Sequence, residues 1–267
     1  MVKVNISEIV FNDKLTSDIF RMRLRAPEQA KRVRAGQILH IKCGEDTDMV
    51  LRRPISVSLS NIEDGTLDIV YQVKGKGTRN LSMMKPGGFL DYMGPSGNFY
   101  ELSAKHSNIA VVGGGIGVFP LLEVLSKYRK MSNDGTHVRC DTFLGFRNID
   151  TVVLEDDFRK LSDDFTVATD DGSYGFNGLV TLPFIDAIKD VKYDIVYACG
   201  PGPMIKALSA IVDNAGIPCQ VSLEQRMGCG IGACKVCVCM IRSGGEAVYK
   251  QVCKDGPVFW SRDVVFN

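Results

Sequence analysis

Four cysteines in the last 39 residues have the spacing of an iron–sulfur site. Cys229, Cys234 and Cys237 follow a C-x4-C-x2-C pattern, and fifteen residues separate Cys237 from Cys253. This is the spacing of a plant-type 2Fe-2S site, in which two irons need four thiolates. Three glycines within residues 228–232 would let the loop wrap tightly and point backbone N–H groups at the sulfurs. The pattern therefore predicts a one-electron redox centre.

Two alternatives concern the same cysteines. A structural zinc ion also accepts four thiolates, but it usually takes them from paired C-x2-C knuckles, which this sequence lacks. Cys239 is a fifth thiol within reach, and the sequence alone leaves it open as a ligand. We favour Cys253, because Cys237 and Cys239 would point the same way in an expected strand without closing a cage. Three other cysteines are expected to be small buried apolar side chains: Cys43, Cys140 and Cys219.

A glycine-rich turn containing Gly113, Gly115 and Gly117 is a candidate phosphate-binding loop. It follows an apolar run and leads into a helical pattern, so its backbone N–H groups would face an anion at a helix N-terminus. The turn departs from the dinucleotide fingerprint G-x-G-x-x-G, because Pro120 stands where the third glycine is expected. An ordinary structural turn is therefore an open alternative.

A second loop of the same kind strengthens the nucleotide interpretation. Cys199, Gly200 and Pro201 end another expected strand and open the next helix. Two such loops at the carboxyl ends of strands form one binding edge.

Two short motifs nearer the start of the chain could also hold phosphate. One is Arg53-Pro54-Ile55-Ser56, preceded by a second arginine, and the other is Gly77-Thr78 before a short helical stretch. An arginine can hold a phosphate bidentately, and the backbone N–H groups at the start of a helix can bind the phosphate next to it. Taken singly, each motif is also compatible with an ordinary turn or a solvated basic pair.

The elements that must position these residues show two patterns. Short alternating runs up to about residue 102 predict an antiparallel barrel or sandwich, with strands at 37–42, 55–59, 67–73 and 89–93. Beyond that point, strands alternate with helices, which predicts a parallel sheet covered by helices. The expected strands are 109–112, 138–145, 166–169 and 194–199, and the clearest helices are 119–131 and 203–214.

Composition narrows the class of partner and compartment. The 32 basic and 31 acidic residues give a net charge of +1, so no global field favours nucleic acid or an anionic membrane. We expect no transmembrane helix and a cytoplasmic protein, since residues 1–10 alternate like a strand and not like a signal peptide. Nine cysteines in such a chain indicate metal binding or redox chemistry and not a disulfide framework.

Together, the motifs resemble those of the ferredoxin reductase superfamily and, within it, the electron-transfer subunits of heteromeric bacterial dihydroorotate dehydrogenases. The resemblance covers essentially the whole chain and implies a multi-domain fold with three parts. These are an FAD-binding β-barrel at 1–103, an NAD-binding α/β domain at 104–217 and a small cysteine-rich 2Fe-2S domain at 218–267. The FAD contacts implied are Arg53, Pro54, Ile55, Ser56, Val70, Tyr71, Gln72, Gly77 and Thr78. The nicotinamide contacts implied are Gly113, Gly115, Gly117, Cys199, Gly200 and Pro201, and the cluster ligands are Cys229, Cys234, Cys237 and Cys253.

Two residues depart from the family pattern. Val236 stands between two cluster ligands where glycine is expected, and it would stiffen the loop. Gln72 stands where a basic residue is common, which weakens the case for that FAD contact.

The resemblance implies a path for electrons. NADH would reduce FAD by hydride transfer, and single electrons would then pass through the cluster. Ser56 would lie near the reactive edge of the flavin, and Cys199 near the nicotinamide. The electrons would end on a separate FMN-containing dihydroorotate dehydrogenase catalytic subunit of pyrimidine biosynthesis, in an assembly of two copies of each subunit.

The choice of nicotinamide can be argued from charge. Asp170 and Asp171 follow the expected strand 166–169, and acidic residues near an adenosine ribose repel a 2′-phosphate. We therefore predict NADH over NADPH. Arg147 follows another strand end and is a counter-signal, since it could neutralise that phosphate.

Three rival functions remain open on the sequence. The same family pattern fits a reductase subunit of a ferredoxin-NADP oxidoreductase or hydrogenase complex, although the residues around Cys253 favour the pyrimidine role. An oxygenase reductase is disfavoured, because fifteen residues before Cys253 are few for a full ferredoxin domain. A non-catalytic redox sensor or zinc-stabilised binding module would make a colourless protein.

Overall fold

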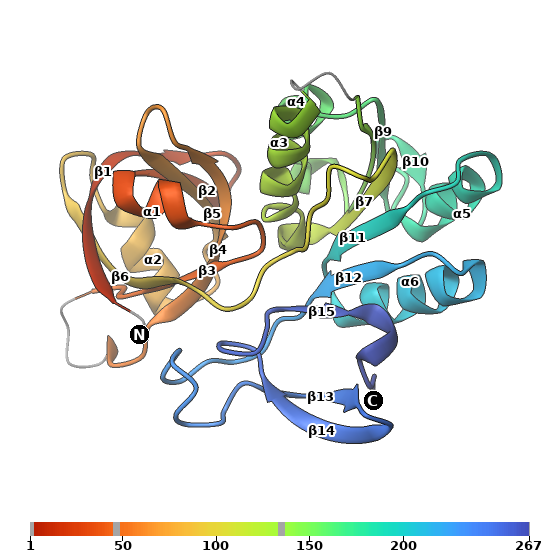
Figure 1. Ribbon diagram of the computed structural model, residues 1–267. Coiled ribbons are helices and arrows are strands. Elements are labelled where there is room, and N and C mark those ends of the chain that lie inside the picture. Colours follow the sequence, from red (N-terminus) through yellow and green to blue (C-terminus); the bar gives the residue numbers. More distant parts are fainter. Residues whose placement is uncertain (1–2, 45–48, 133–136, 267) are drawn as a thin grey trace. The chain divides into compact units, whose positions relative to one another are not determined.

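The computed structural model describes residues 3–44, 49–132 and 137–266 (Figure 1). The described chain forms two compact units. The first contains the residues up to Phe99, together with Glu224–Cys239 and Tyr249–Pro257. The second contains Tyr100–Leu223, Met240–Val248 and the chain from Val258 onward. The first unit therefore combines segments from the two ends of the sequence.

The first unit is built on a closed antiparallel barrel, which settles the choice between barrel and sandwich. Its strands are joined in the order β1-β2-β5-β4-β3-β6. Their bounds are β1 Val4–Lys14, β2 Ile19–Arg25, β3 Ile38–Ile41, β4 Arg53–Asn61, β5 Thr66–Gln72 and β6 Phe89–Ser96. Two short helices accompany them, α1 Pro27–Arg32 and α2 Lys76–Met83.

Alternation along the strands fills the barrel with apolar side chains. Every second residue of β3 and β5 belongs to one buried cluster: Leu39, Ile41, Leu67, Ile69 and Tyr71. Tyr71 stacks on Phe20, with ring centroids 5.9 Å apart. Its hydroxyl donates a hydrogen bond to Asn12 Oδ1 at 2.8 Å. The barrel is thus a packed core, and cofactors must bind on its outside.

The second unit is a seven-stranded sheet in the order β10-β9-β8-β7-β11-β12-β15. All neighbouring strands are parallel except the antiparallel pair β12 and β15. The bounds are β7 Asn108–Gly114, β8 Arg139–Phe146, β9 Asp164–Thr169, β10 Phe176–Asn177, β11 Ile195–Cys199, β12 Cys219–Ser222 and β15 Val258–Trp260. The predicted parallel sheet is confirmed.

Helices cover both faces of this sheet, as Figure 1 shows for α3 and α4 on one side and α5 and α6 on the other. Their bounds are α3 Leu121–Ser132, α4 Glu155–Arg159, α5 Thr181–Asp190 and α6 Gly202–Ala215. Short 3-10 turns occur at η2 Gly115–Val118, η3 Ile149–Thr151 and η4 Ser261–Asp263. Helix α6 is capped by Gly216, whose φ of 66° is the left-handed conformation that glycine adopts without strain.

The cysteine-rich segment is mostly loop. It leads into a hairpin of β13 Val238–Ser243 and β14 Glu246–Gln251. Nearby in sequence, β12 adds a parallel strand to the sheet of the second unit and β15 an antiparallel one, a role that sequence reasoning did not give them. The division into functional domains after residues 103 and 217 stays a prediction, because the two compact units are drawn on different boundaries.

No helix in the described part of the chain combines the length and the apolar character needed to span a membrane.

Candidate functional site

The cluster loop wraps backbone N–H groups around one cysteine sulfur. Cys229 Sγ accepts hydrogen bonds from the N–H groups of Ile231 at 3.5 Å, Ala233 at 3.3 Å and Cys234 at 3.4 Å. In return, the N–H of Cys229 donates to Cys234 Sγ at 3.4 Å. Positive φ angles at Gly230 (70°) and Gly232 (84°) make this tight path possible. The glycines thus serve the purpose predicted from the sequence.

These N–H groups favour the thiolate that iron requires. The N–H of Ile231 first, followed by those of Cys234 and Ala233, lowers the pKa of the Cys229 thiol to about 6. A thiol with that pKa is ionised at neutral pH, and only the thiolate is a good metal ligand. The loop is therefore arranged to hold negative sulfur before any metal binds.

The other two candidate ligands form a second, buried pair. The N–H of Cys253 donates to Cys237 Sγ at 3.4 Å, and the N–H of Val252 donates to the Cys237 carbonyl at 2.9 Å. Burial first, and then the neighbouring Cys237, raises the pKa of the Cys253 thiol. Cys234 is by contrast exposed. One side of the site is thus enclosed and the other faces outward.

The donor chemistry fits a 2Fe-2S cluster. Among the residues that the structure describes, no three His, Cys, Asp or Glu side chains are grouped as ligands of a single metal ion. Two thiol pairs are present instead, and they would supply the four thiolates that two irons need. Backbone N–H groups already directed at sulfur are the outer contacts that tune such a centre.

Cys239 has a different environment. It lies within β13, and its thiol donates to the Lys250 carbonyl across the hairpin at 3.7 Å. Burial, which is the largest effect, raises its pKa to about 11. Burial raises the pKa of Cys253 as well, so the bond of the Cys239 thiol within the hairpin, and not its protonation, supports Cys253 as the fourth ligand, which stays a prediction.

The arginine motif lies at the start of β4, next to helix α2. Arg52 is used structurally, since its Nη1 forms an ion pair with Asp91 Oδ1 at 2.7 Å. Arg53 extends toward Gly77, where an added β-carbon would lie 3.3 Å from its Nε. The structure therefore brings Arg53 and Gly77 together, as expected for two halves of one phosphate site.

Three other predicted FAD contacts have side chains engaged elsewhere. Tyr71 points into the barrel core, and Gln72 donates from Nε2 to Asp18 Oδ2 at 2.7 Å. Thr78 Oγ1 accepts from the N–H groups of Lys74 and Gly75, which fixes the start of α2. Any contact of Tyr71 or Gln72 with a flavin would thus come from the backbone, whereas Thr78 shapes the loop around it.

The two glycine loops of the second unit meet at one edge of its sheet. Gly113 and Cys199 are register partners at the carboxyl ends of β7 and β11. A β-carbon on Gly117 would lie 2.6 Å from Gly200 Cα, so only glycine permits this approach. Gly115 has a φ of 54° and no heavy atom within 4 Å of the position of an added β-carbon. The predicted binding edge is thus assembled from both loops.

Acidic residues lie farther along the same edge. The N–H of Asp170 bonds to the Phe146 carbonyl at 3.0 Å, and that of Asp171 to the Arg147 carbonyl at 3.4 Å. The hydroxyl of Ser173, and then its N–H, lowers the pKa of Asp171. An ionised Asp171 and Arg147 therefore follow neighbouring strands. The acidic residue that would favour NADH and the arginine that could accept the 2′-phosphate of NADPH both lie at this edge of the sheet.

The remaining cysteines are inert. Cys43, Cys140 and Cys219 are buried, as predicted from the sequence. Burial raises the pKa of Cys43, and it raises those of Cys140 and Cys219 to about 12. These thiols stay protonated and pack as small apolar groups.

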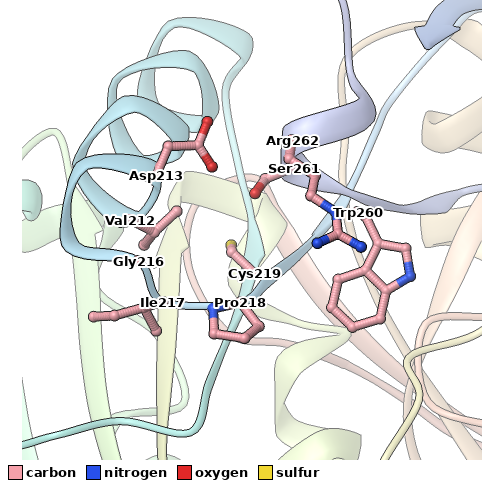
Figure 2. A pocket seen from close by; sticks show the side chains of 9 residues that line it. All are labelled: Val212, Asp213, Gly216, Ile217, Pro218, Cys219, Trp260, Ser261 and Arg262. Carbon is pink, nitrogen blue, oxygen red and sulfur yellow. The ribbon is translucent and has the colours of Figure 1, made fainter. Parts of the chain in front are cut away.

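Cys219 also borders a surface pocket of about 230 Å³ in the second unit, shown in Figure 2. The pocket lies between the end of α6 and the segment that follows β15. Asp213 lines one side, and the Arg262 guanidinium lies near the Trp260 ring, 5.7 Å from its centroid. None of the residues that the sequence motifs predict for cofactors lines it.

His40 was not singled out from the sequence, although both of its ring nitrogens are buried without a hydrogen-bond partner among the described residues. It lies in β3 at an exposed fraction of 1%, against Gly230 of the cluster loop. A polar residue at an outward position of an otherwise apolar strand was the signal that could have revealed it.

Comparison with known proteins identifies the barrel and the cysteine-rich end of the chain. Residues 7–100 match the family described as an oxidoreductase FAD-binding domain. Residues 224–265 match the iron-sulfur cluster binding domain of dihydroorotate dehydrogenase B. These matches favour a flavin and an iron–sulfur cluster over the structural zinc ion considered above.

Relatives match over nearly the whole chain. The electron transfer subunit of dihydroorotate dehydrogenase B (NAD(+)) from Caldanaerobacter subterraneus subsp. tengcongensis is 40% identical, over 97% of this chain and 98% of its own. The subunit of the same name from Desulforamulus reducens is 36% identical over 100% of both chains.

Solved structures agree with the fold. A chain of the NADH-dependent reduced ferredoxin-NADP oxidoreductase has a TM-score of 0.84 and 32% identity, over 98% of this chain and 90% of that one. The cytochrome b5 reductase domain of Ulva prolifera nitrate reductase has a TM-score of 0.66 at 19% identity, covering 80% of this chain and 94% of that one. The second likeness supports the fold alone.

The barrel, the sheet and the thiol site together define a flavin and iron–sulfur oxidoreductase of the ferredoxin reductase type. Within that class, the chain belongs to the family of dihydroorotate dehydrogenase B electron transfer subunits.

Proposed function

We propose that this chain carries electrons between NAD(H) and an FMN-containing dihydroorotate dehydrogenase catalytic subunit, through one FAD and one 2Fe-2S cluster, in pyrimidine biosynthesis. FAD can exchange a hydride with the nicotinamide and single electrons with the cluster. The protein contributes position and electrostatics more than acid–base chemistry.

One observation carries this proposal. The barrel that matches a flavin-binding domain and all four candidate cluster cysteines belong to the same compact unit, although about 130 residues separate them in sequence. The N–H of Asn98, just after β6, donates to the Gly256 carbonyl at 2.6 Å and ties the two segments together. A flavin on this barrel and a cluster in this loop would be held by one body, as electron transfer between them requires.

The chain's own residues have distinct tasks in this scheme. Arg53 and the start of α2 would hold FAD phosphate, and Ser56 would lie at the reactive edge of the flavin. Gly117 and Gly200 would bring backbone N–H groups close to the nicotinamide cofactor, with Cys199 beside its ring. The four cysteines would bind the cluster.

The partner would dock where the cluster loop faces outward. Ile231 and Val236, on either side of the exposed Cys234, are 52% and 55% exposed, so apolar surface surrounds the outer thiol pair. A partner that covered both side chains would bury them together with the outer thiol pair. We propose an assembly of two catalytic and two electron-transfer subunits. It would be cytoplasmic, since nine free cysteines suit a reducing compartment.

The proposal is tested by purifying the tagged chain from its native cell. The bound partner is identified by mass spectrometry, and orotate formation from dihydroorotate is assayed with NAD+. We expect a dihydroorotate dehydrogenase catalytic subunit and turnover that depends on this chain. A yellow-brown preparation whose partner does not oxidise dihydroorotate would keep the electron path and reject the pathway.

A second candidate function has specific support. The match to the ferredoxin-NADP oxidoreductase chain covers nearly as much of both chains as the match to the dihydroorotate dehydrogenase relatives does. The same purification distinguishes the two, because that function predicts a partner that reduces ferredoxin.

A further inference from the structure

His40 lies on the outside of the barrel and yet is sealed from solvent. Its neighbours Leu39 and Ile41 belong to the barrel core, so strand alternation directs the His40 side chain outward. An outward residue is normally exposed, but His40 is 1% exposed. Its cover includes the cluster loop: a β-carbon at Gly230 would overlap the imidazole Nδ1. The ring is thus enclosed between the barrel wall and the loop that carries Cys229.

The enclosed ring lacks the hydrogen bonds that a buried histidine needs. In the described residues, neither Nδ1 nor Nε2 has a hydrogen-bond partner, and both atoms are buried. A buried polar atom without a partner loses its hydration and gains nothing in return, which is why such atoms are rare. Burial, the largest effect, lowers the pKa of His40; the Arg52 backbone opposes this, and the charges of Arg52 and Arg53 add to the lowering. An imidazole carries at least one N–H in either protonation state, so the ring has a hydrogen to donate.

The position of the ring indicates what accepts that N–H. His40 is the register partner of Pro54, in the predicted flavin motif, and it touches the residue next to Cys229. The sulfurs of a cluster are anionic acceptors, and a donor directed at them stabilises the reduced, more negative state. Contact with the ring also explains why position 230 requires glycine.

We propose that His40 is a positioning residue that donates a ring N–H hydrogen bond to a sulfur of the 2Fe-2S cluster and thereby raises its reduction potential. This inference rests on the proposed function, since it requires the cluster. His40 couples the barrel strand beside the flavin motif to the loop that holds the cluster.

The first test compares three variants of the full chain, purified with its catalytic partner. His40→Leu removes the donor, whereas His40→Asn has nearly the shape of leucine but keeps an N–H, and His40→Gln places its N–H farther out. The cluster potential is measured by redox titration with EPR detection. We expect His40→Leu to favour the oxidised cluster about tenfold, a shift of about 59 mV to lower potential. At least one amide variant should restore most of the shift.

An unchanged potential in His40→Leu, or equal shifts in all three variants, would overturn the proposal. So would a shift confined to the flavin potential, because the ring would then serve the flavin. Iron content and visible absorbance of each variant show whether the cluster is present.

The second test reads the unaltered His40 side chain. The chain has three histidines, so labelling with 15N-histidine leaves few possible sources of coupling to the reduced cluster. Pulsed EPR should detect a weak 15N coupling in the unaltered complex. His137→Leu should keep it, because His137 is exposed and bonded to Asp163. A cluster signal without the coupling rejects the role of His40, whereas the absence of any cluster signal rejects the proposed function itself.

Discussion

Gly117 and Gly200 belong to different loops, yet their backbones touch. A β-carbon at 117 would lie 2.6 Å from both the N and the Cα of Gly200, closer than real β-carbons approach other atoms. The contact joins the turn after β7 to the turn after β11, two neighbouring parallel strands. It leaves both sets of backbone N–H groups at one edge of the sheet, which is where such folds bind nucleotides.

We predict that Gly117→Ala weakens the use of NADH. Overpacking of this kind costs about 1–3 kcal/mol, so the KM for NADH should rise about tenfold or more. Steady-state kinetics with a dye acceptor measures this without the partner subunit. Gly202→Ala is a suitable control, because an added β-carbon there meets no atom within 4 Å. Equal effects of the two substitutions would show that the contact does not matter.

Two cysteines close in sequence should behave differently when replaced by serine. Cys234→Ser removes a thiol of the outer pair and should reduce bound iron more than about tenfold. Cys239→Ser removes a thiol whose hydrogen bond stays within the hairpin, so iron content and visible absorbance should persist. Iron analysis of the purified chains decides the matter. If Cys239→Ser lost its iron while Cys253→Ser kept it, the fourth ligand would be Cys239 and not Cys253.

The acidic edge predicts a preference for NADH over NADPH. Asp171 is held by Ser173 in a turn after β9, and its charge would repel a 2′-phosphate. We expect kcat/KM to favour NADH at least about tenfold, equivalent to about 1.4 kcal/mol. Asp171→Asn should lower the ratio of kcat/KM for NADH to kcat/KM for NADPH, and Arg147→Ala should raise it. Comparable values for the two cofactors in the unaltered chain would refute the prediction.

The sequence predicted the architecture well where local patterns were strong. The runs around Leu39 and Val111 gave strands because alternation and continuous apolar character are local signals. The strands β12 and β15 were missed in the sheet, since segments of four and three residues give little periodicity. Their pairing depends on residues far apart in the chain.

In the candidate site, too, the features set by local sequence were predictable and those set by distant segments were not. The cluster cysteines were predictable from spacing alone, because the loop itself sets their geometry. The fixed positions of Tyr71 and Gln72, and the enclosure of His40, depend on packing between distant segments, which spacing cannot show. Arg52 and Arg53 are adjacent and chemically identical, yet only the three-dimensional structure shows that Asp91 holds the first.

His106 should make the second unit less stable as the pH falls. Burial lowers its pKa, although the charge of Asp194 opposes this, and its Nδ1 lies 2.6 Å from the Tyr128 hydroxyl. The unfolded chain therefore binds a proton below about pH 6.5 that the folded chain resists, so stability is lost from there downward. His106→Gln should flatten the dependence between about pH 7.5 and 5.5, by at most about 1.4 kcal/mol per pH unit. Urea unfolding of both chains at several pH values measures it, and parallel curves would contradict the assignment.

Ser56 should affect the reduction of the flavin and leave the cluster untouched. It lies half-buried in β4, in the motif expected at the reactive edge of the flavin. One neutral hydrogen bond is worth about 0.5–1.5 kcal/mol, so Ser56→Ala should slow flavin reduction by NADH about three- to tenfold. Stopped-flow absorbance follows the step directly, and iron content should stay constant. Ser58→Ala, in the same strand but outside the motif, is the control. An unchanged rate of hydride transfer in Ser56→Ala would show that this hydroxyl does not assist the flavin.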